Sequence, residues 1–174
     1  MAFEHRAFCF DFRAFEAELA PLLYRALSDE DAEAIRDFVE RNREALTDPY
    51  EGEPLSEEWE EMLEARDVQA YGDFALTKYY SPKEDIGLGT EWTSVGDRLR
   101  GTGSGLDGTL LGIPFGPPVK QFDPGRMGSY FQSPEMVAEH LRRLEKEPLD
   151  SDIDRAKSVL RAAQEVGIGL YVTF

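Results

Sequence analysis

Apolar residues alternate with other residues at both ends of the chain. Phenylalanine occupies every second position from Phe8 to Phe12, and this period of two predicts a strand with one well-buried face. Residues 168–174 alternate in the same way and predict a second strand, with its apolar side chains on one face. Because chain ends often lie close together, we expect these two strands to pair in the middle of a small sheet.

Between these strands, most apolar residues recur at the three- and four-residue spacing of amphipathic helices. The first predicted helix follows Phe12 and is kinked or restarted at Pro21, because proline lacks the N–H of an interior helical hydrogen bond. A further helix is predicted from Trp92 to Leu99. Four more are predicted to begin at serine caps, which are Ser28, Ser56, Ser133 and Ser151.

Two segments have less regular patterns. Residues 68–80 fit either a helix or a strand, and we favour a strand for 74–80. Residues 101–128 are rich in glycine and proline, but they also carry apolar residues that a flexible linker would lack. The pattern therefore predicts a packed loop with short strands at 109–113 and 118–122.

The order of these elements predicts an α+β fold. No period of 20 to 50 residues repeats, and no change in composition marks a second domain, so residues 1–174 are expected to form one globular domain. We expect a small mixed sheet that includes the N- and C-terminal strands and is covered by about five helices.

The chain carries 35 acidic and 19 basic side chains, a formal net charge of −16. This balance excludes a sequence-independent grip on nucleic acid, which depends on a surplus of lysine and arginine. It also argues against binding to anionic membrane surfaces. No apolar run approaches the roughly 20 residues of a membrane-spanning helix, and the first residues lack the apolar core of a signal peptide. Cys9 is the single cysteine, so no internal disulfide can form and a cytoplasmic protein is expected.

Motifs for cofactor, metal and catalytic chemistry are incomplete. The glycines of 103–108 match a dinucleotide-binding pattern, but the strand before it and the helix after it are missing. The acidic run from Asp150 to Asp154 resembles the start of a calcium loop, yet Arg155 and Arg161 replace two required residues. We therefore predict no cofactor, no metal and no catalytic residue, and a binding protein is favoured over an enzyme.

The negative charge is concentrated in one part of the chain. Residues 29–67 hold 16 acidic and 4 basic side chains and so carry −12 of the net charge. Like charges placed close together lower the stability of the fold. A surface of one sign also speeds association with an oppositely charged partner, which gives such a cluster a functional reason. We predict that this segment docks a basic protein, as an immunity protein or inhibitor of a toxin or nuclease would. The predicted contact residues are Asp48, Tyr50, Glu51, Glu53, Glu57, Glu58, Trp59, Glu61 and Glu64, with Tyr50 and Trp59 as aromatic anchors.

An alternative prediction is a small enzyme or ligand-binding domain with its site in the glycine-rich 101–130 region. Long loops often carry function, and aromatic walls with a few charged groups are typical of small-ligand sites. The candidate pocket residues are Trp92, Tyr80, Lys120, Arg126 and Tyr130. A structural domain with neither property is the third possibility.

Overall fold

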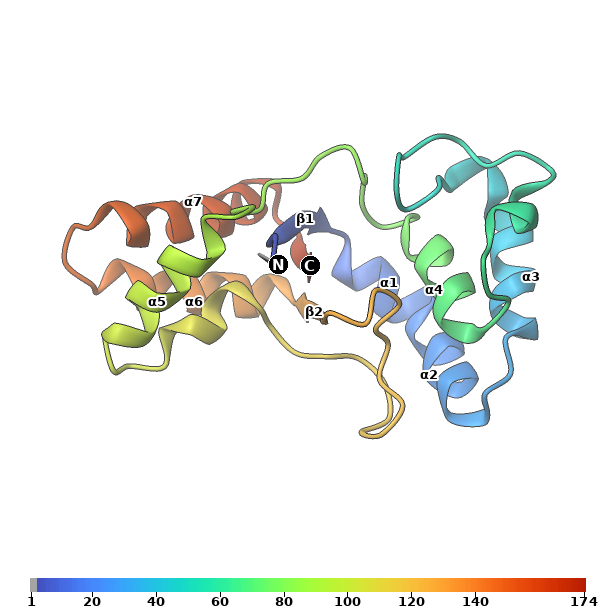
Figure 1. The fold of residues 1–174 in the computed structure, drawn as a ribbon, viewed down its shortest axis with the longest axis horizontal. Helices are drawn as coiled ribbons and strands as arrows, with labels where there is room; N and C mark the ends of the chain where they lie inside the picture. Colours follow the sequence, from blue (N-terminus) through green and yellow to red (C-terminus); the bar gives the residue numbers. More distant parts are fainter. Residues whose placement is uncertain (1–2) are drawn as a thin grey trace.

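A computed structural model describes residues 3–174 and has an α+β fold. The strands β1 (Arg6–Phe10), β2 (Ser129–Gln132) and β3 (Gly169–Thr173) form a three-stranded antiparallel sheet in the order β1-β3-β2. In its register, Phe8 lies opposite Tyr171. The predicted pairing of the N- and C-terminal strands is therefore confirmed, and the two ends of the chain lie together beside the sheet (Figure 1).

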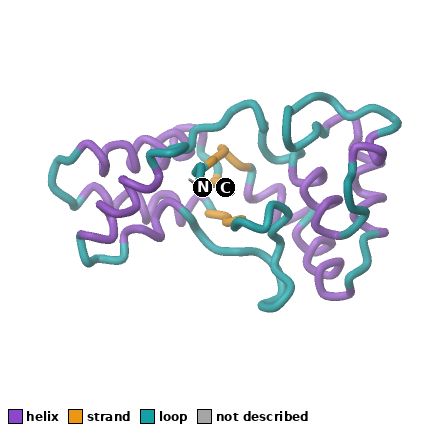
Figure 2. The backbone as a smooth tube through the Cα atoms, viewed as in Figure 1, coloured by secondary structure: helices purple, strands orange, loops and turns teal. Residues whose placement is uncertain are grey.

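The sheet lies between two groups of helices, and each face is buried in its own apolar cluster. One face carries the rings of Phe8, Phe10, Phe131 and Tyr171, and the other carries smaller side chains such as Val172. The first group contains α1 (Phe12–Glu18), α2 (Ala20–Asp29), α3 (Glu33–Asn42) and α4 (Val68–Leu76). The second group contains α5 (Trp92–Gly101), α6 (Pro134–Glu145) and α7 (Ser151–Val166). The two groups form opposite ends of an elongated molecule, with the strands in the middle (Figure 2).

Several predicted helix ends are confirmed. α1 ends at Glu18, and Pro21 lies in the first turn of α2, where its missing N–H leaves no bond unmade. The Ser133 hydroxyl accepts the N–H of Met136 at the start of α6. Gly167 ends α7 in the left-handed conformation, with φ 76°. Within residues 3–174, no helix is both long and apolar enough to cross a membrane.

The other three predicted serine caps are wrong. Ser28 lies inside α2, and the side chain of Asp31 instead accepts the N–H of Glu33 at the start of α3. α7 is capped by Asp150, which accepts two backbone N–H groups, and Ser151 is its first residue. After Ser56 the chain forms a short 3-10 helix, Trp59–Met62, in place of the predicted helix.

The ambiguous segments also differ from the prediction. Residues 74–80 are not a strand, because α4 is capped by Asp67 and buries its helical stripe in the core. The segment 109–113 starts in the 3-10 helix Leu106–Leu110 and pairs with β2 only through an isolated bridge at Ile113. Residues 118–122 form no strand. Prolines in this segment lack the N–H groups that a sheet ladder needs.

Candidate functional site

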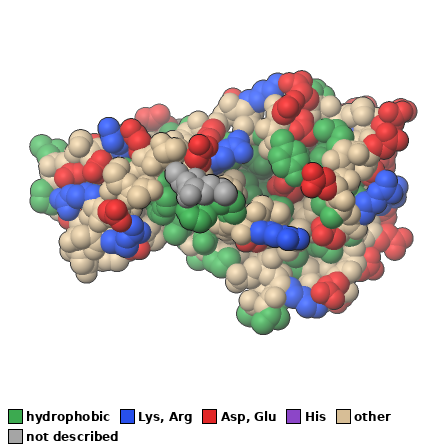
Figure 3. All heavy atoms as spheres, viewed as in Figure 1, with side chains coloured by type: hydrophobic (Ala, Val, Ile, Leu, Met, Phe, Trp, Pro, Cys, Tyr) green, Lys and Arg blue, Asp and Glu red, His purple; other side chains and the backbone are tan. Residues whose placement is uncertain are grey.

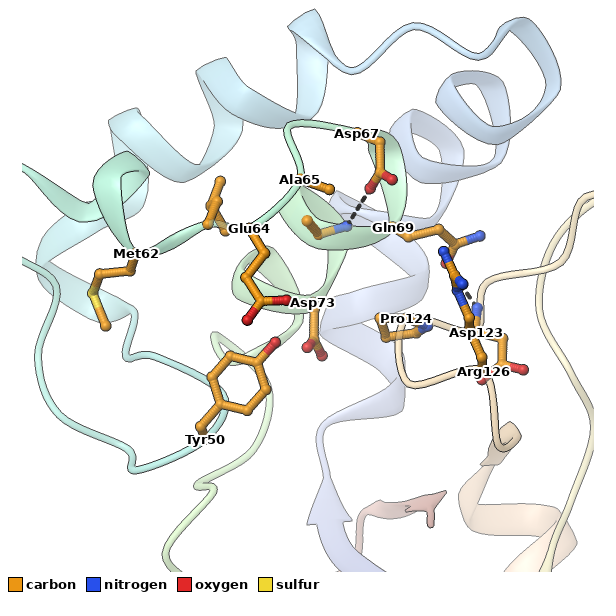
Figure 4. Close-up of a pocket in the computed structure, with 12 residues that line it drawn as sticks. Tyr50, Met62, Glu64, Ala65, Asp67, Gln69, Asp73, Asp123, Pro124 and Arg126 are labelled. Carbon is orange, nitrogen blue, oxygen red and sulfur yellow. Dashed lines mark hydrogen bonds between the residues drawn. The ribbon is translucent and has the colours of Figure 1, made fainter.

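A cleft opens on the side of the molecule that holds α4 and the acidic 48–64 segment. Its main cavity has a volume of ≈ 670 Å³ and is lined by residues that include Tyr50, Met62, Glu64, Asp73 and Arg126 (Figure 4). A smaller hollow of ≈ 100 Å³ shares Tyr50, Asp73 and Pro124 with this cavity. It extends the cleft to Tyr80 and to the end of the sheet.

α4 positions Asp73 at the centre of the cleft. The carboxylate of Asp67 accepts the N–H of Ala70 at 2.9 Å and so fixes the first turn of the helix. Gly72 allows close packing, since a Cβ there would lie 2.8 Å from the ring of Phe122. Phe74 is buried in the core, and the preceding side chain, Asp73, therefore emerges on the flank that faces the cleft.

The loop that carries Tyr50 is organised by Asp48, which is 3% exposed. Its carboxylate accepts the backbone N–H groups of Tyr50 (3.0 Å), Glu51 (2.6 Å) and Glu53 (2.9 Å). Burial raises the pKa of Asp48, but these hydrogen bonds outweigh it and hold that pKa below its ordinary value. Asp48 therefore shapes the loop, and the prediction that it contacts a partner is wrong.

The opposite wall comes from the predicted packed loop. Gln69 of α4 accepts the N–H of Asp123 at 2.8 Å and donates to the carbonyl of Gln121 at 2.9 Å. The Asp123 carboxylate accepts the N–H of Gly128 at 3.0 Å. These bonds fasten the loop to α4 and bring the exposed Arg126 to the edge of the cleft, where its side chain extends beside Gln69 and away from Asp73 (Figure 4).

Asp73 has an unusual electrostatic setting. Within residues 3–174, no hydrogen bond or ion pair reaches its carboxylate, which lies beside the Tyr50 hydroxyl and the Glu64 carboxylate (Figure 4). Burial raises the pKa of Asp73 to about 7, and the charge of Arg6 only partly opposes this. Arg6 is itself paired with Asp85 at 3.4 Å. At neutral pH, Asp73 is therefore divided between its protonated and ionised forms.

The tyrosines around Asp73 stay neutral. Burial raises the pKa of Tyr80 and Tyr171, and the nearby Asp73 raises both further. Burial and then Asp73 raise the pKa of Tyr50 as well, although its side chain is exposed. Tyr50 and Tyr80 line the cleft and can offer hydrogen bonds and aromatic surface to a guest, whereas the ring of Tyr171 is buried. Within residues 3–174, no group of three histidine, cysteine or acidic side chains is arranged to hold a metal ion.

The 48–64 segment carries a set of exposed carboxylates, here called the acidic rim, and one of them, Glu64, lines the cleft. The carboxylates of this rim are Glu51, Glu53, Glu57, Glu58, Glu61 and Glu64. Lys83 pairs with Glu53 at 2.7 Å, and Arg43 reaches Glu57 at 3.8 Å. In the described part of the chain, the other four make no ion pair. Acidic side chains line this end of the molecule, with a few basic ones between them (Figure 3).

Trp59 does not belong to the exposed rim. Its side chain is 1% exposed, packs against Tyr71 and Phe74, and donates its indole N–H to Glu40 at 2.9 Å. The prediction that it anchors a partner is therefore wrong, because the apolar stripe of this segment faces the core. Tyr50, the other predicted anchor, is 71% exposed, and Met62 beside the same cavity is 52% exposed.

The five predicted pocket residues do not meet. Tyr80 and Arg126 line the cleft, but Trp92 stacks on the buried His5 at 5.1 Å between ring centroids, next to the C-terminal Phe174. Tyr130 packs against the apolar cluster of α5–α7. Lys120 lies beside Glu30 at 3.6 Å, outside the cavity.

Asp73 is not among the site residues predicted from the sequence. The segment VQAYGDFAL holds one acidic residue among mostly apolar ones, and its pattern does not distinguish a helix from a strand. A helix over 68–76 would have drawn attention to Asp73 as the acidic residue beside a buried stripe. Its neighbours in the cleft come from segments far apart in the sequence, and no spacing reveals that arrangement.

The cleft thus combines an unpaired carboxyl group, aromatic walls and an acidic rim. Comparison with protein-family models, with curated proteins and with solved structures gives no match for this chain.

Proposed function

We propose that this protein is a cytoplasmic binding protein that docks a basic protein through the acidic rim and the cleft. The observation that carries the proposal is the unpaired carboxyl of Asp73 at the centre of a cleft whose rim holds further unpaired carboxylates. A basic toxin or nuclease is the class of partner that this chemistry fits, and the corresponding role is that of an immunity or inhibitor protein.

Charge supports the proposal. Glu51, Glu58, Glu61 and Glu64 are exposed on one continuous segment and, in the described residues, make no ion pair. A surface of one sign raises the association rate with an oppositely charged partner by 10 to 10³-fold. The effect falls with salt, since exposed charges are screened over about 10 Å at 0.1 M ionic strength.

Exposed apolar groups support it as well. Tyr50 and Met62 both line the cavity and stand among the rim carboxylates. Protein interfaces are enriched in tyrosine and methionine, and their energetic centres are often aromatic. Tyr50 therefore takes the role of anchor, and the carboxylates around it supply steering and register.

The test compares two charge reversals of equal size. Glu58→Lys with Glu61→Lys removes unpaired rim carboxylates, and Glu16→Lys with Glu165→Lys changes the net charge equally on α1 and α7. Binding of a fluorescent arginine-rich peptide is measured by anisotropy at low and high salt. We expect the rim reversal to weaken low-salt binding by roughly 10-fold more than the control reversal does. Equal losses for the two variants would show that net charge, and not this face, recruits the peptide.

A second candidate function follows from Asp73 itself. A carboxyl group that titrates near neutral pH in a cleft can act as a general acid or base, which would suit a small enzyme or ligand-binding domain. The nearby phenols of Tyr80 and Tyr171 remain protonated, so each can donate a hydrogen bond as well as accept one. The two candidates separate on size: a small ligand would bind equally well to the protein with the rim reversal, whereas a basic protein would not.

A further inference from the structure

We propose that the cleft is an arginine pocket, in which a guanidinium group of the partner pairs with the Asp73 carboxylate beside the rings of Tyr50 and Tyr80. The inference rests on the proposed function and deepens it. It names the side chain that enters the cleft and the residue that receives it.

The cavity contains a carboxylate, that of Asp73, with no ion-pair partner among the described residues. Asp73 is half-buried, and its carboxylate faces the ≈ 670 Å³ cavity and has no hydrogen-bond partner within residues 3–174. A carboxylate in such a place is costly unless a cation pairs with it. The cavity is open at the Tyr50 side, so a long side chain can enter from solvent.

The charges that surround Asp73 favour a cationic guest. Four carboxylates line the main cavity, against one guanidinium, that of Arg126, which extends away from Asp73 beside Gln69 (Figure 4). The other cation nearby, Arg6, is paired with Asp85 and acts on Asp73 only through space. The titratable and charged groups that line the two hollows beside Asp73 are Arg6, Tyr50, Glu64, Asp67, Tyr80, Asp123, Arg126 and Tyr171.

The walls favour guanidinium over other cations. Tyr50 and Tyr80 line the hollow next to Asp73, and a planar guanidinium stacks on aromatic faces while donating a pair of hydrogen bonds to a carboxylate. An ammonium group is more strongly hydrated and lacks the planar fork. A metal ion would need more ligands than the described residues bring together.

The pocket has a distinctive pH dependence. A guanidinium pairs with the ionised form of Asp73, so its binding must expel the proton that the carboxyl holds part of the time near pH 7. The affinity should therefore rise by about 10-fold between pH 6 and pH 8. Attraction by exposed rim carboxylates that are already ionised would give a flat profile in this range.

The experiment is a titration with N-acetyl-arginine amide, followed by NMR at pH 6, 7 and 8. N-acetyl-citrulline amide, of nearly the same shape but without charge, is the control probe. We expect the wild type to bind the arginine probe more tightly as the pH rises and the citrulline probe at least about 10-fold more weakly. Asp73→Asn should lose about 10-fold in affinity at pH 8 and should lose the pH dependence. Glu64→Gln should weaken binding slightly and keep the pH dependence.

The outcomes separate the pocket from the docking face. A flat pH profile, equal binding of the two probes, or unchanged binding by Asp73→Asn would overturn the arginine pocket. If the arginine probe does not bind but the rim reversal still weakens peptide binding, the pocket is wrong and the proposed function stands. If the probe binds as expected but the rim reversal has no effect, the pocket stands and the docking face is wrong.

Discussion

Replacing Asp73 by asparagine should stabilise the protein, and the gain should depend on pH. Asparagine has nearly the same shape as aspartate and never ionises, so it resembles the protonated form that the buried site prefers. The pKa of Asp73 in the folded protein is about 7, against 3.8 for an ordinary aspartate. Between these values the folded state holds a proton that the unfolded state releases, so the stability contributed by this group falls as the pH rises.

The magnitude follows from the difference between the two pKa values. If that difference acted in full, ionising Asp73 in the folded state would cost about 4 kcal/mol at pH 8. The carboxylate still faces an open cavity, and water in the cavity reduces the cost, so we expect Asp73→Asn to raise the free energy of unfolding by about 2 kcal/mol at pH 8. The gain should shrink as the pH falls through 7 and should disappear near pH 4.

Urea unfolding followed by circular dichroism at pH 8, 6 and 4 measures this change. Glu61→Gln is the matched control, because it removes one exposed, unpaired carboxylate and so reports the general relief of negative charge. A gain for Asp73→Asn that is the same at pH 8 and pH 4, or no larger than that of Glu61→Gln, would show that ionisation of Asp73 does not destabilise the folded protein.

Three further predictions test the fold that holds the cleft. Burial lowers the pKa of His5, so the unfolded state takes up a proton more readily than the folded state does. The stability advantage of the wild type over His5→Gln should therefore shrink as the pH falls below about 6.5. Urea unfolding across that pH range measures it. Gly169→Ala should destabilise the protein by about 3 kcal/mol or more, since its Cβ would lie 2.1 Å from a carbonyl oxygen of β2. Gly101→Ala is the control: its Cβ would have no neighbouring atom within 4 Å, so the melting temperature should stay unchanged or rise. The buried hydroxyl of Thr47 has no hydrogen-bond partner within residues 3–174, so Thr47→Val should leave the stability unchanged or raise it. Thr77→Val should cost about 1 to 3 kcal/mol, because the Thr77 hydroxyl hydrogen-bonds the backbone of Thr47 and of Phe74. A larger loss of stability for Thr47→Val than for Thr77→Val would contradict both expectations.

The regular parts of the fold could be predicted because local patterns decide them. The period-two pattern at each end of the chain predicts strands that must bury apolar faces, and Pro21 separates two helices through its own missing N–H. β2 was missed, since a strand of four residues, Ser129–Gln132, is too short to show a period. The pattern in 68–76 is too short to distinguish a helix from a strand, and the packing of this segment against Phe122 and the core favours the helix α4.

The candidate site could be predicted only in part. The concentration of charge in 29–67 is visible in the sequence, and several of its carboxylates are exposed on the rim. The cleft itself was not visible, since it forms where α4 meets the 48–54 loop and the 123–126 loop. Trp59 shows why the sequence was not sufficient. Its neighbours along the chain are exposed glutamates, but its ring is buried in the core.

The most direct test of the account is to map where a cationic partner binds. Backbone amide signals are recorded by NMR while the arginine-rich peptide is added at low salt. We expect the largest shift changes in 48–64, 67–73 and 123–126, the segments that form the rim and the cleft. Changes spread evenly over the molecule, or centred on α5–α7, would contradict the claim that this face is the docking site.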